Sequence, residues 1–118
     1  MTDYSKLSDD EINKAVAEYD LDGDWLLEPT DDRRFTFFNL GVAGKRTAEL
    51  PNYCNNPSDA WPIILSNLIA LKPVKMYVGG HRWFASKGDG DFGLKFADDN
   101  PLRAAMIVYL MMKESENV

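Results

Sequence analysis

One segment toward the carboxy terminus limits the possible folds more than any other. From Leu102 to Met112 every residue except Arg103 is apolar, and Asn100-Pro101 precedes the segment. An asparagine cap followed by proline is a common start of a helix. A helix that is apolar on all sides is stable only where the rest of the protein covers it. We therefore expect a buried central helix, or a homodimer interface if one apolar side stays exposed.

The amino-terminal segment predicts a second helix. Ser8 and Glu11 have the spacing of a capping box, in which each side chain binds a backbone N–H group at the start of the helix. Apolar residues follow at helical spacing as far as Tyr19. Because Asp22-Gly23 is a turn signal, the helix should end near Tyr19 or Asp20.

Strands are expected in two groups. A short strand over 25–28 and a longer strand over 33–40 follow the first helix, and the loop at 41–53 has room for one edge strand. Residues 75–97 predict a three-stranded antiparallel meander. Gly79-Gly80 fits a two-residue hairpin turn in this meander.

The register of that turn determines which side chains share a face of the sheet. With Gly79-Gly80 as the two turn residues, Val78 would lie opposite His81. Trp83 would then belong to the apolar face. The side chains predicted for the opposite face are Lys75, Tyr77, Arg82 and Phe84.

A further helix is expected between the two groups of strands. Ser58 or Asp59 would cap it, which places Pro62 in the first turn, where proline is tolerated. Pro73 would end the segment. The apolar residues that would share one face of this helix are Ile64, Leu68 and Leu71.

These elements together predict one α+β domain spanning residues 1–118. Its order is helix, strands, helix, three-stranded meander, helix, with the apolar carboxy-terminal helix packed on an antiparallel sheet. A chain of 118 residues can bury roughly two thirds of its unfolded surface, which is enough for an ordinary core. Asn56-Pro57 and Asn100-Pro101 are each followed by alanine and isoleucine at the same spacing, which is compatible with two similar strand–helix units.

The charge is distributed unevenly along the chain. The net charge is −6, yet residues 1–32 hold eleven acidic and two basic residues, and the rest is mildly basic. Such an asymmetry can mark an electrostatic docking surface for a partner protein. The alternative is a solvated acidic helix and loop. The acidic residues assigned to this candidate docking surface are Asp22, Asp24, Asp31 and Asp32.

A basic stretch with aromatic residues supplies a different candidate surface. A sheet face that carries cations and aromatic rings can bind single-stranded nucleic acid. Placing Trp83 in the core and the overall acidity of the chain both weigh against this function. The cations of this candidate surface are Lys72, Lys75, Arg82 and Lys87.

The sequence predicts no catalytic residue, metal or cofactor. One Cys54 and one His81 exclude an internal disulfide and the common structural zinc sites. A calcium loop counted from Asp20 fails, because Trp25 and Asp31 occupy the positions that need Gly and Glu. We expect Cys54 to be a small buried residue and His81 to be an exposed hairpin residue. No motif for nucleotide binding or nucleophilic catalysis is present.

Several polar residues beside the predicted helix starts are candidates for a binding site. Asn55, Asn56 and Asp59 could bind an anion or a peptide, although capping and turn roles explain them as well. Trp61 is either a core residue or an exposed contact residue. Arg103 stands near the positive end of a helix and calls for a carboxylate partner. The candidates for that partner are Asp59, Asp98 and Asp99.

Three segments resemble a known family. YSKLSDDEIN at 4–13, CNNPSDAWPII at 54–64 and NPLRAAMIV at 100–108 are similar to the opening, central and carboxy-terminal motifs of the small NinX-type phage proteins. The resemblance implies a product of the accessory early region of lambda-like phages and prophages. No catalytic residues are established for that family, so none is carried over. Residues 20–50 and 72–97 match no part of the resemblance.

These observations predict a phage-encoded, non-enzymatic protein of the host bacterial cytoplasm that binds a host or phage protein. Inhibition of a bacterial defence system is one form of this function, by analogy with other small phage proteins. The longest uninterrupted apolar run, Ala104 to Met112, has nine residues, whereas a helix that crosses a membrane needs about 20. Two alternatives stay open. One is a nucleic-acid accessory protein, and the other is a small-molecule binder with a pocket near Asn55, Asp59, Trp61 and Arg103.

Overall fold

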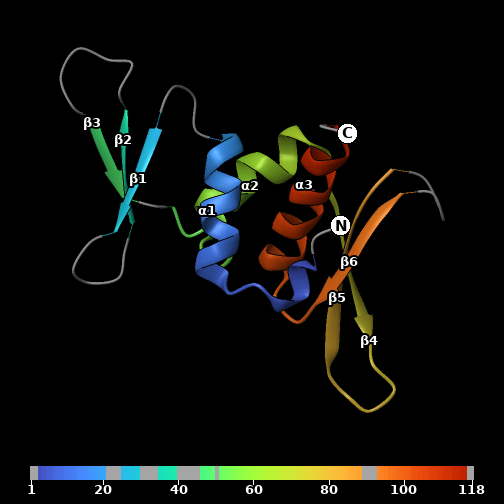
Figure 1. Ribbon diagram of the computed structural model, residues 1–118. Coiled ribbons are helices and arrows are strands. Elements are labelled where there is room, and N and C mark those ends of the chain that lie inside the picture. Colours follow the sequence, from blue (N-terminus) through green and yellow to red (C-terminus); the bar gives the residue numbers. More distant parts are fainter. Residues whose placement is uncertain are drawn as a thin grey trace.

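A computed structural model of the chain describes residues 3–20, 25–29, 35–39, 46–49, 51–88 and 93–116, and for the strands between 25 and 49 it describes the backbone alone. The predicted order of helices and strands is confirmed (Figure 1). The elements are η1 (Tyr4–Lys6), α1 (Asp9–Asp20), β1 (Trp25–Pro29), β2 (Phe35–Asn39), β3 (Arg46–Glu49), α2 (Pro57–Ser66), β4 (Ala70–Lys75), β5 (His81–Lys87), β6 (Leu94–Asp98) and α3 (Pro101–Glu116).

The strands form two three-stranded antiparallel meanders, one of β1-β2-β3 and one of β4-β5-β6. Each meander is followed along the chain by a helix that begins at an Asn-Pro pair. Helix α3 contacts β5 and β6 on one side and α1 and α2 on another, so it is the central element of the fold (Figure 1). The carboxy-terminal helix therefore packs on an antiparallel sheet, as the sequence predicts.

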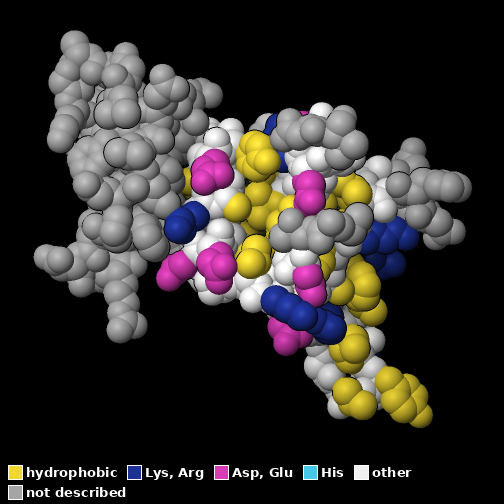
Figure 2. All heavy atoms as spheres, viewed as in Figure 1, with side chains coloured by type: hydrophobic (Ala, Val, Ile, Leu, Met, Phe, Trp, Pro, Cys, Tyr) yellow, Lys and Arg dark blue, Asp and Glu magenta, His cyan; other side chains and the backbone are white. Residues whose placement is uncertain are grey.

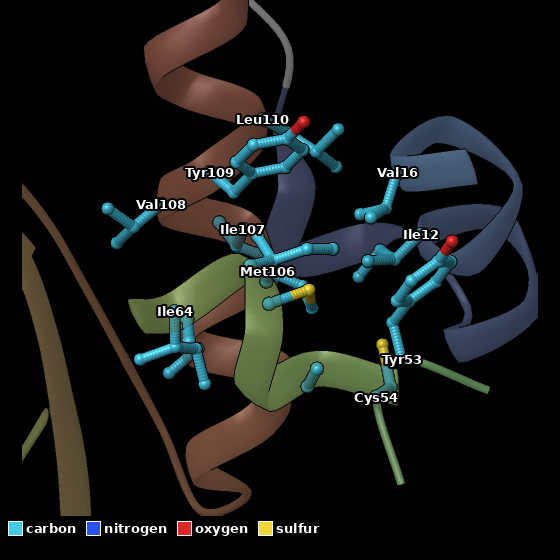
Figure 3. Packing of buried hydrophobic residues seen from close by; sticks show 14 of the residues in the cluster. Ile12, Val16, Tyr53, Cys54, Ile64, Met106, Ile107, Val108, Tyr109 and Leu110 are labelled. Carbon is cyan, nitrogen blue, oxygen red and sulfur yellow. The ribbon is translucent and has the colours of Figure 1, made fainter. Parts of the chain in front are cut away.

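The core is built around α3. All seven residues from Ala104 to Leu110 are buried, which explains why this helix is apolar on every side. Ile12 and Val16 of α1 pack against it together with Tyr53 and Cys54 from the turn before α2 (Figure 3). This stretch of α3 leaves no apolar side exposed, so the condition for a homodimer through α3 is not met here.

Helix α1 begins with the predicted capping box. The Ser8 amide donates to the Glu11 carboxylate at 3.2 Å, and the Glu11 amide donates to the Ser8 hydroxyl at 3.2 Å. The helix ends at Asp20, as expected. Tyr19 is 43% exposed, and its ring meets the ring of Tyr109 edge-on at a centroid distance of 6.4 Å.

Helix α2 begins earlier than predicted. Asn56 is its cap, since the Asn56 side chain accepts from the Ser58 amide at 3.1 Å, and Pro57 is the first helical residue. The predicted cap at Ser58 or Asp59 is therefore wrong, and Pro62 lies inside the helix. Pro62 removes only the bond to the carbonyl of the exposed Ser58, which water can satisfy.

The end of α2 also differs from the prediction, because the helix stops at Ser66. Ile64 is buried, but Leu68 follows the helix with φ of 54° and is 78% exposed. Leu71 belongs to β4, so the predicted face of Ile64, Leu68 and Leu71 does not exist. Pro73 lies within β4, which is an edge strand, where a residue without an N–H group is tolerated.

The β4–β5 hairpin has a longer loop than predicted. Lys75 pairs with His81, so the pairing of Val78 with His81 is wrong. The Gly79 amide donates to the Met76 carbonyl at 3.1 Å, which closes a four-residue turn over 76–79 with Tyr77 and Val78 at its centre. Both glycines have positive φ, 100° and 75°, which glycine adopts without strain. Gly79 is therefore the last residue of the turn and Gly80 follows it, so the glycines are not its two central residues.

The observed register changes which residues share a face. The predicted grouping within β5 is right, because Ala85 is buried toward α3 and Phe84 is exposed on the other side. Lys75, however, lies opposite His81, so it falls on the side of Trp83 and not on that of Arg82. The predicted second turn at 87–91 extends beyond the described residues.

Helix α3 begins at Asn100-Pro101 as predicted but extends further, to Glu116, where the sequence suggests an end at Lys113. Two contacts hold the additional turn. The Tyr4 hydroxyl donates to the Glu114 carboxylate, and Lys113 pairs with Glu116 at 3.5 Å.

Candidate functional site

Arg103 is the centre of a partly buried ion cluster. Its side chain is 12% exposed, and its guanidinium donates to Asp9 at 2.8 Å and to Asp98 at 3.2 Å. It also donates to the Leu7 carbonyl at 2.7 Å and to the Tyr4 carbonyl at 3.4 Å. Of the three carboxylates predicted as its partner, the structure selects Asp98. Asp9 has no sequence signal, because it lies 94 residues away.

A set of asparagines continues this cluster around the turn before α2. Asn13 is 3% exposed, donates to Asn52 at 3.1 Å and accepts from the Cys54 amide at 3.0 Å. Asn55 donates to Asp9 at 3.0 Å, and Asn100 donates to the Cys54 carbonyl at 2.6 Å. We call this set the polar network. Its members are Asp9, Asn13, Asn52, Asn55, Asp98, Asn100 and Arg103.

The polar network joins α1, the turn before α2 and the start of α3 through bonds within the chain. Asp59, outside the network, accepts from the Asn52 amide at 3.0 Å, and Asn56 caps α2. Asn55, Asp59 and Arg103 are therefore engaged in caps and internal pairs, whereas Trp61 points to solvent from α2. These structural roles are the ones that the sequence also allows for these polar residues.

Trp61 is exposed on α2, whereas Trp83 of β5 is partly buried. Trp61 is 51% exposed, Leu65 lies one turn further along α2 with 55% exposure, and Leu68, two residues beyond the end of the helix, is 78% exposed. We call these three residues the α2 stripe. The other exposed residues of α2 carry no charge either, and they are Pro57, Ser58, Pro62 and Ser66. Trp61 is therefore not a core residue, because half of its side chain is exposed.

The second sheet has a face that points away from α3. Phe84 lies on it, 40% exposed, between Lys72 of β4 and Ala97 of β6. Arg82 and Lys95 occupy the same side by the alternation of the strands. We call these residues the outer face, which consists of Lys72, Val74, Arg82, Phe84, Lys95 and Ala97.

Only two of the four predicted basic residues belong to the outer face. Lys72 and Arg82 lie there, whereas Lys75 and Lys87 have the opposite alternation. Lys95 falls outside the basic stretch of the sequence, and only the pairing of β6 with β5 places it on this face.

At the tip of the β4–β5 hairpin, Tyr77 and Val78 are almost fully exposed, and Figure 2 shows hydrophobic side chains projecting there. The acidic residues Asp22, Asp24, Asp31 and Asp32 lie outside the described residues.

Cys54 is a buried residue, as predicted. Burial and the nearby charge of Asp9 raise the pKa of its thiol to about 12, so the thiol is protonated at neutral pH. Its sulfur contacts the Asp9 carbonyl at 3.9 Å, while His81 is exposed at the start of β5.

Within the described ranges no three His, Cys, Asp or Glu side chains gather as a metal site would require. None of the helices seen in those ranges is long and apolar enough to span a membrane.

Alkaline pH should destabilise the fold. The unfolded thiol loses its proton near pH 8.5, whereas folded Cys54 keeps its proton until its pKa of about 12. Between these values the unfolded state binds fewer protons, so the free energy of unfolding falls by about 1.4 kcal/mol per pH unit. Burial also raises the pKa of Tyr53 and of Tyr109, which adds to the fall at higher pH. Urea unfolding followed as a function of pH measures this, and Cys54→Ala should remove the earliest part of the fall. An unchanged pH profile in that variant would contradict the assignment.

The fold and the polar network define a small α+β protein with two three-stranded meanders, in which α3 packs on the second meander and on α1 and α2. The family model described as Bacteriophage P22, NinX matches residues 3–113, and the chain belongs to this family. The resemblance seen in the three sequence motifs is thereby confirmed. No curated protein and no solved structure matches the chain.

Proposed function

We propose that the chain is a phage accessory protein that acts without catalysis, by binding a protein of the host or of the phage. The observation that supports this most is the α2 stripe. The cores of protein interfaces are depleted of charge and enriched in aromatic residues, and tryptophan is among the residues that contribute most binding energy. A half-exposed Trp61 has these properties, because the other exposed residues of α2 carry no charge and the one acid of the helix, Asp59, is partly buried.

The size of the α2 stripe favours a partner with an apolar groove over a second copy of this chain. The exposed fractions of the three side chains leave roughly 400 Å² of apolar surface, whereas a stable complex buries about 800 Å² per partner. Two stripes laid against each other would fall short of this value, and both copies carry a net charge of −6. A groove that encloses α2 would bury both flanks of the helix as well.

The charge of the chain supports the same kind of partner. The acidic residues of the first quarter would attract a protein with a basic rim and speed its association. A protein of a bacterial defence system is one class of partner with which this function fits. The buried, protonated thiol of Cys54 and the separate position of His81 support a function without nucleophilic catalysis.

The proposal is tested by purification of the tagged protein from phage-infected cells with the double variant Trp61→Ala/Leu65→Ala. We expect a partner that the wild type recovers to be lost, with binding of the purified pair weakened at least about 30-fold, since hot-spot truncations cost 2 kcal/mol or more. The variant Tyr77→Ala is the matched control, because it removes an exposed aromatic side chain at the hairpin tip.

Equal recovery of the partner by Trp61→Ala/Leu65→Ala and by the wild type would overturn the proposed site. A dimer of the wild type that the double variant dissociates would replace the proposed partner with a second copy. A variant that neutralises the acidic residues distinguishes their contribution from that of the α2 stripe, and it is Asp22→Asn/Asp24→Asn/Asp31→Asn/Asp32→Asn. It should slow association and reduce the salt dependence of the association rate, while the dissociation rate stays close to that of the wild type.

A further inference from the structure

We propose that the outer face of the second sheet binds single-stranded nucleic acid, with Phe84 stacking on a base and the flanking cations contacting phosphates. This site is separate from the α2 stripe and does not depend on the proposed function. The outer face belongs to β4, β5 and β6, whereas the α2 stripe lies on a helix that contacts α3.

The arrangement around Phe84 supports the inference. The ring is 40% exposed in the middle strand, and the neighbouring strands place Lys72 directly beside it and Lys95 one row further along. In a single strand, phosphates alternate with bases. A surface that binds it therefore combines aromatic rings, which stack on the bases, with cations, which contact the phosphates. Arg82 adds a third cation on the same side, 42% exposed and paired with Asp99 at 3.4 Å.

The acidity of the whole chain does not cancel this local charge. Among the described residues of β4, β5 and β6, the outer face carries no acidic side chain, but Asp99, which directly follows β6, pairs with Arg82 at 3.4 Å, so Arg82 adds little net charge to this face. Asp9, in the first turn of α1, and Asp98, at the end of β6, are both paired with Arg103, whose positive charge partly offsets theirs.

The same residues argue against a duplex or a protein on this face. In a duplex the flat sides of the bases are stacked on each other, so Phe84 would have no base to stack on. The centre of a protein interface is depleted of lysine, whereas Lys72 lies immediately beside Phe84. A single strand offers both unstacked bases and phosphates.

The test is the fluorescence anisotropy of a labelled oligothymidine of about 15 nucleotides. We expect a dissociation constant of roughly 10⁻⁵ to 10⁻⁴ M at low salt. The logarithm of the binding constant should fall with the logarithm of the salt concentration with a slope near −2, because three phosphate contacts would each contribute about −0.7. Phe84→Leu keeps an apolar side chain but removes the ring, so it should weaken binding about 5-fold or more.

A matched pair of variants in β4 distinguishes binding at the outer face from nonspecific electrostatic attraction of the oligonucleotide to the protein. Lys72→Ala should weaken binding and reduce the salt slope by about 0.7, whereas Lys75→Ala, on the opposite side of the same strand, should change both much less. Trp61→Ala should bind as the wild type does, which distinguishes this site from the α2 stripe. Thermal melting of each variant checks the fold.

Four results would overturn the inference. They are no binding at low salt, equal effects of Lys72→Ala and Lys75→Ala, binding of duplex DNA as tight as that of the single strand, and unchanged binding by a folded Phe84→Leu variant. A protein partner lost on Phe84→Leu while the oligonucleotide fails to bind would assign the outer face to protein recognition.

Discussion

Replacing Arg103 with methionine is expected to lower the free energy of unfolding by about 3 kcal/mol. Methionine keeps much of the apolar stem, so the loss comes from the guanidinium. Without it, Asp9 and Asp98 remain close together with no cation between them, and the Leu7 carbonyl loses a bond of 2.7 Å. Removing one partner of a buried pair costs about 3–5 kcal/mol, and we take the lower end because Asp9 is 43% exposed.

Urea unfolding of three variants measures the effect. Arg103→Lys keeps the charge but loses the forked geometry, so it should recover only part of the stability. Lys113→Ala is the control, because it removes a solvent-accessible pair with Glu116, which is worth less than about 1 kcal/mol. If Arg103→Met and Lys113→Ala have similar effects, the polar network does not stabilise the fold.

The two Asn-Pro helix starts should respond very differently to the same substitution. Asn100→Ala is expected to cost about 2–3 kcal/mol, and Asn56→Ala about 1 kcal/mol. Asn100 caps α3 through the Leu102 amide at 2.9 Å, and it also donates to the Cys54 carbonyl and the Asn55 side chain. Asn56 is exposed and caps α2 through the Ser58 amide at 3.1 Å.

The comparison is made by urea unfolding of both alanine variants and of Asn100→Ser. Serine also caps helices well but does not reach the Cys54 carbonyl, so Asn100→Ser should lie between Asn100→Ala and the wild type. Equal losses for Asn100→Ala and Asn56→Ala would show that the bonds from Asn100 to the α2 turn contribute nothing to stability.

Signals within a few residues predicted the fold well. The capping box of α1 and the Asn-Pro start of α3 each depend on neighbours in the sequence, and both helices begin where expected. The Asn-Pro pair before α2 has the same pattern, and α2 begins there and continues through Pro62, against the prediction of a later start. A proline costs least where the carbonyl that it leaves unpaired faces water.

Features that depend on pairing across the chain were predicted less well. Moving Lys75 opposite His81 changes which face each residue of β4 lies on, because side chains alternate along a strand. The pair of Arg103 and Asp9 joins opposite ends of the chain, and no local pattern selects it. The exposure of Trp61 does not follow from the sequence, because a tryptophan at a helix start fits a core as well as a surface.

The central position of α3 has a consequence for folding during synthesis on the ribosome. The ribosome makes α1 early, but the surface that covers Ile12 and Val16 belongs to a helix that begins at Pro101. At 5–20 residues per second, roughly 4–16 seconds pass between the two. During that time the apolar side of α1 has no partner from α3, so nascent chains are open to chaperones and proteases. The core can therefore close only after α3 has left the ribosome.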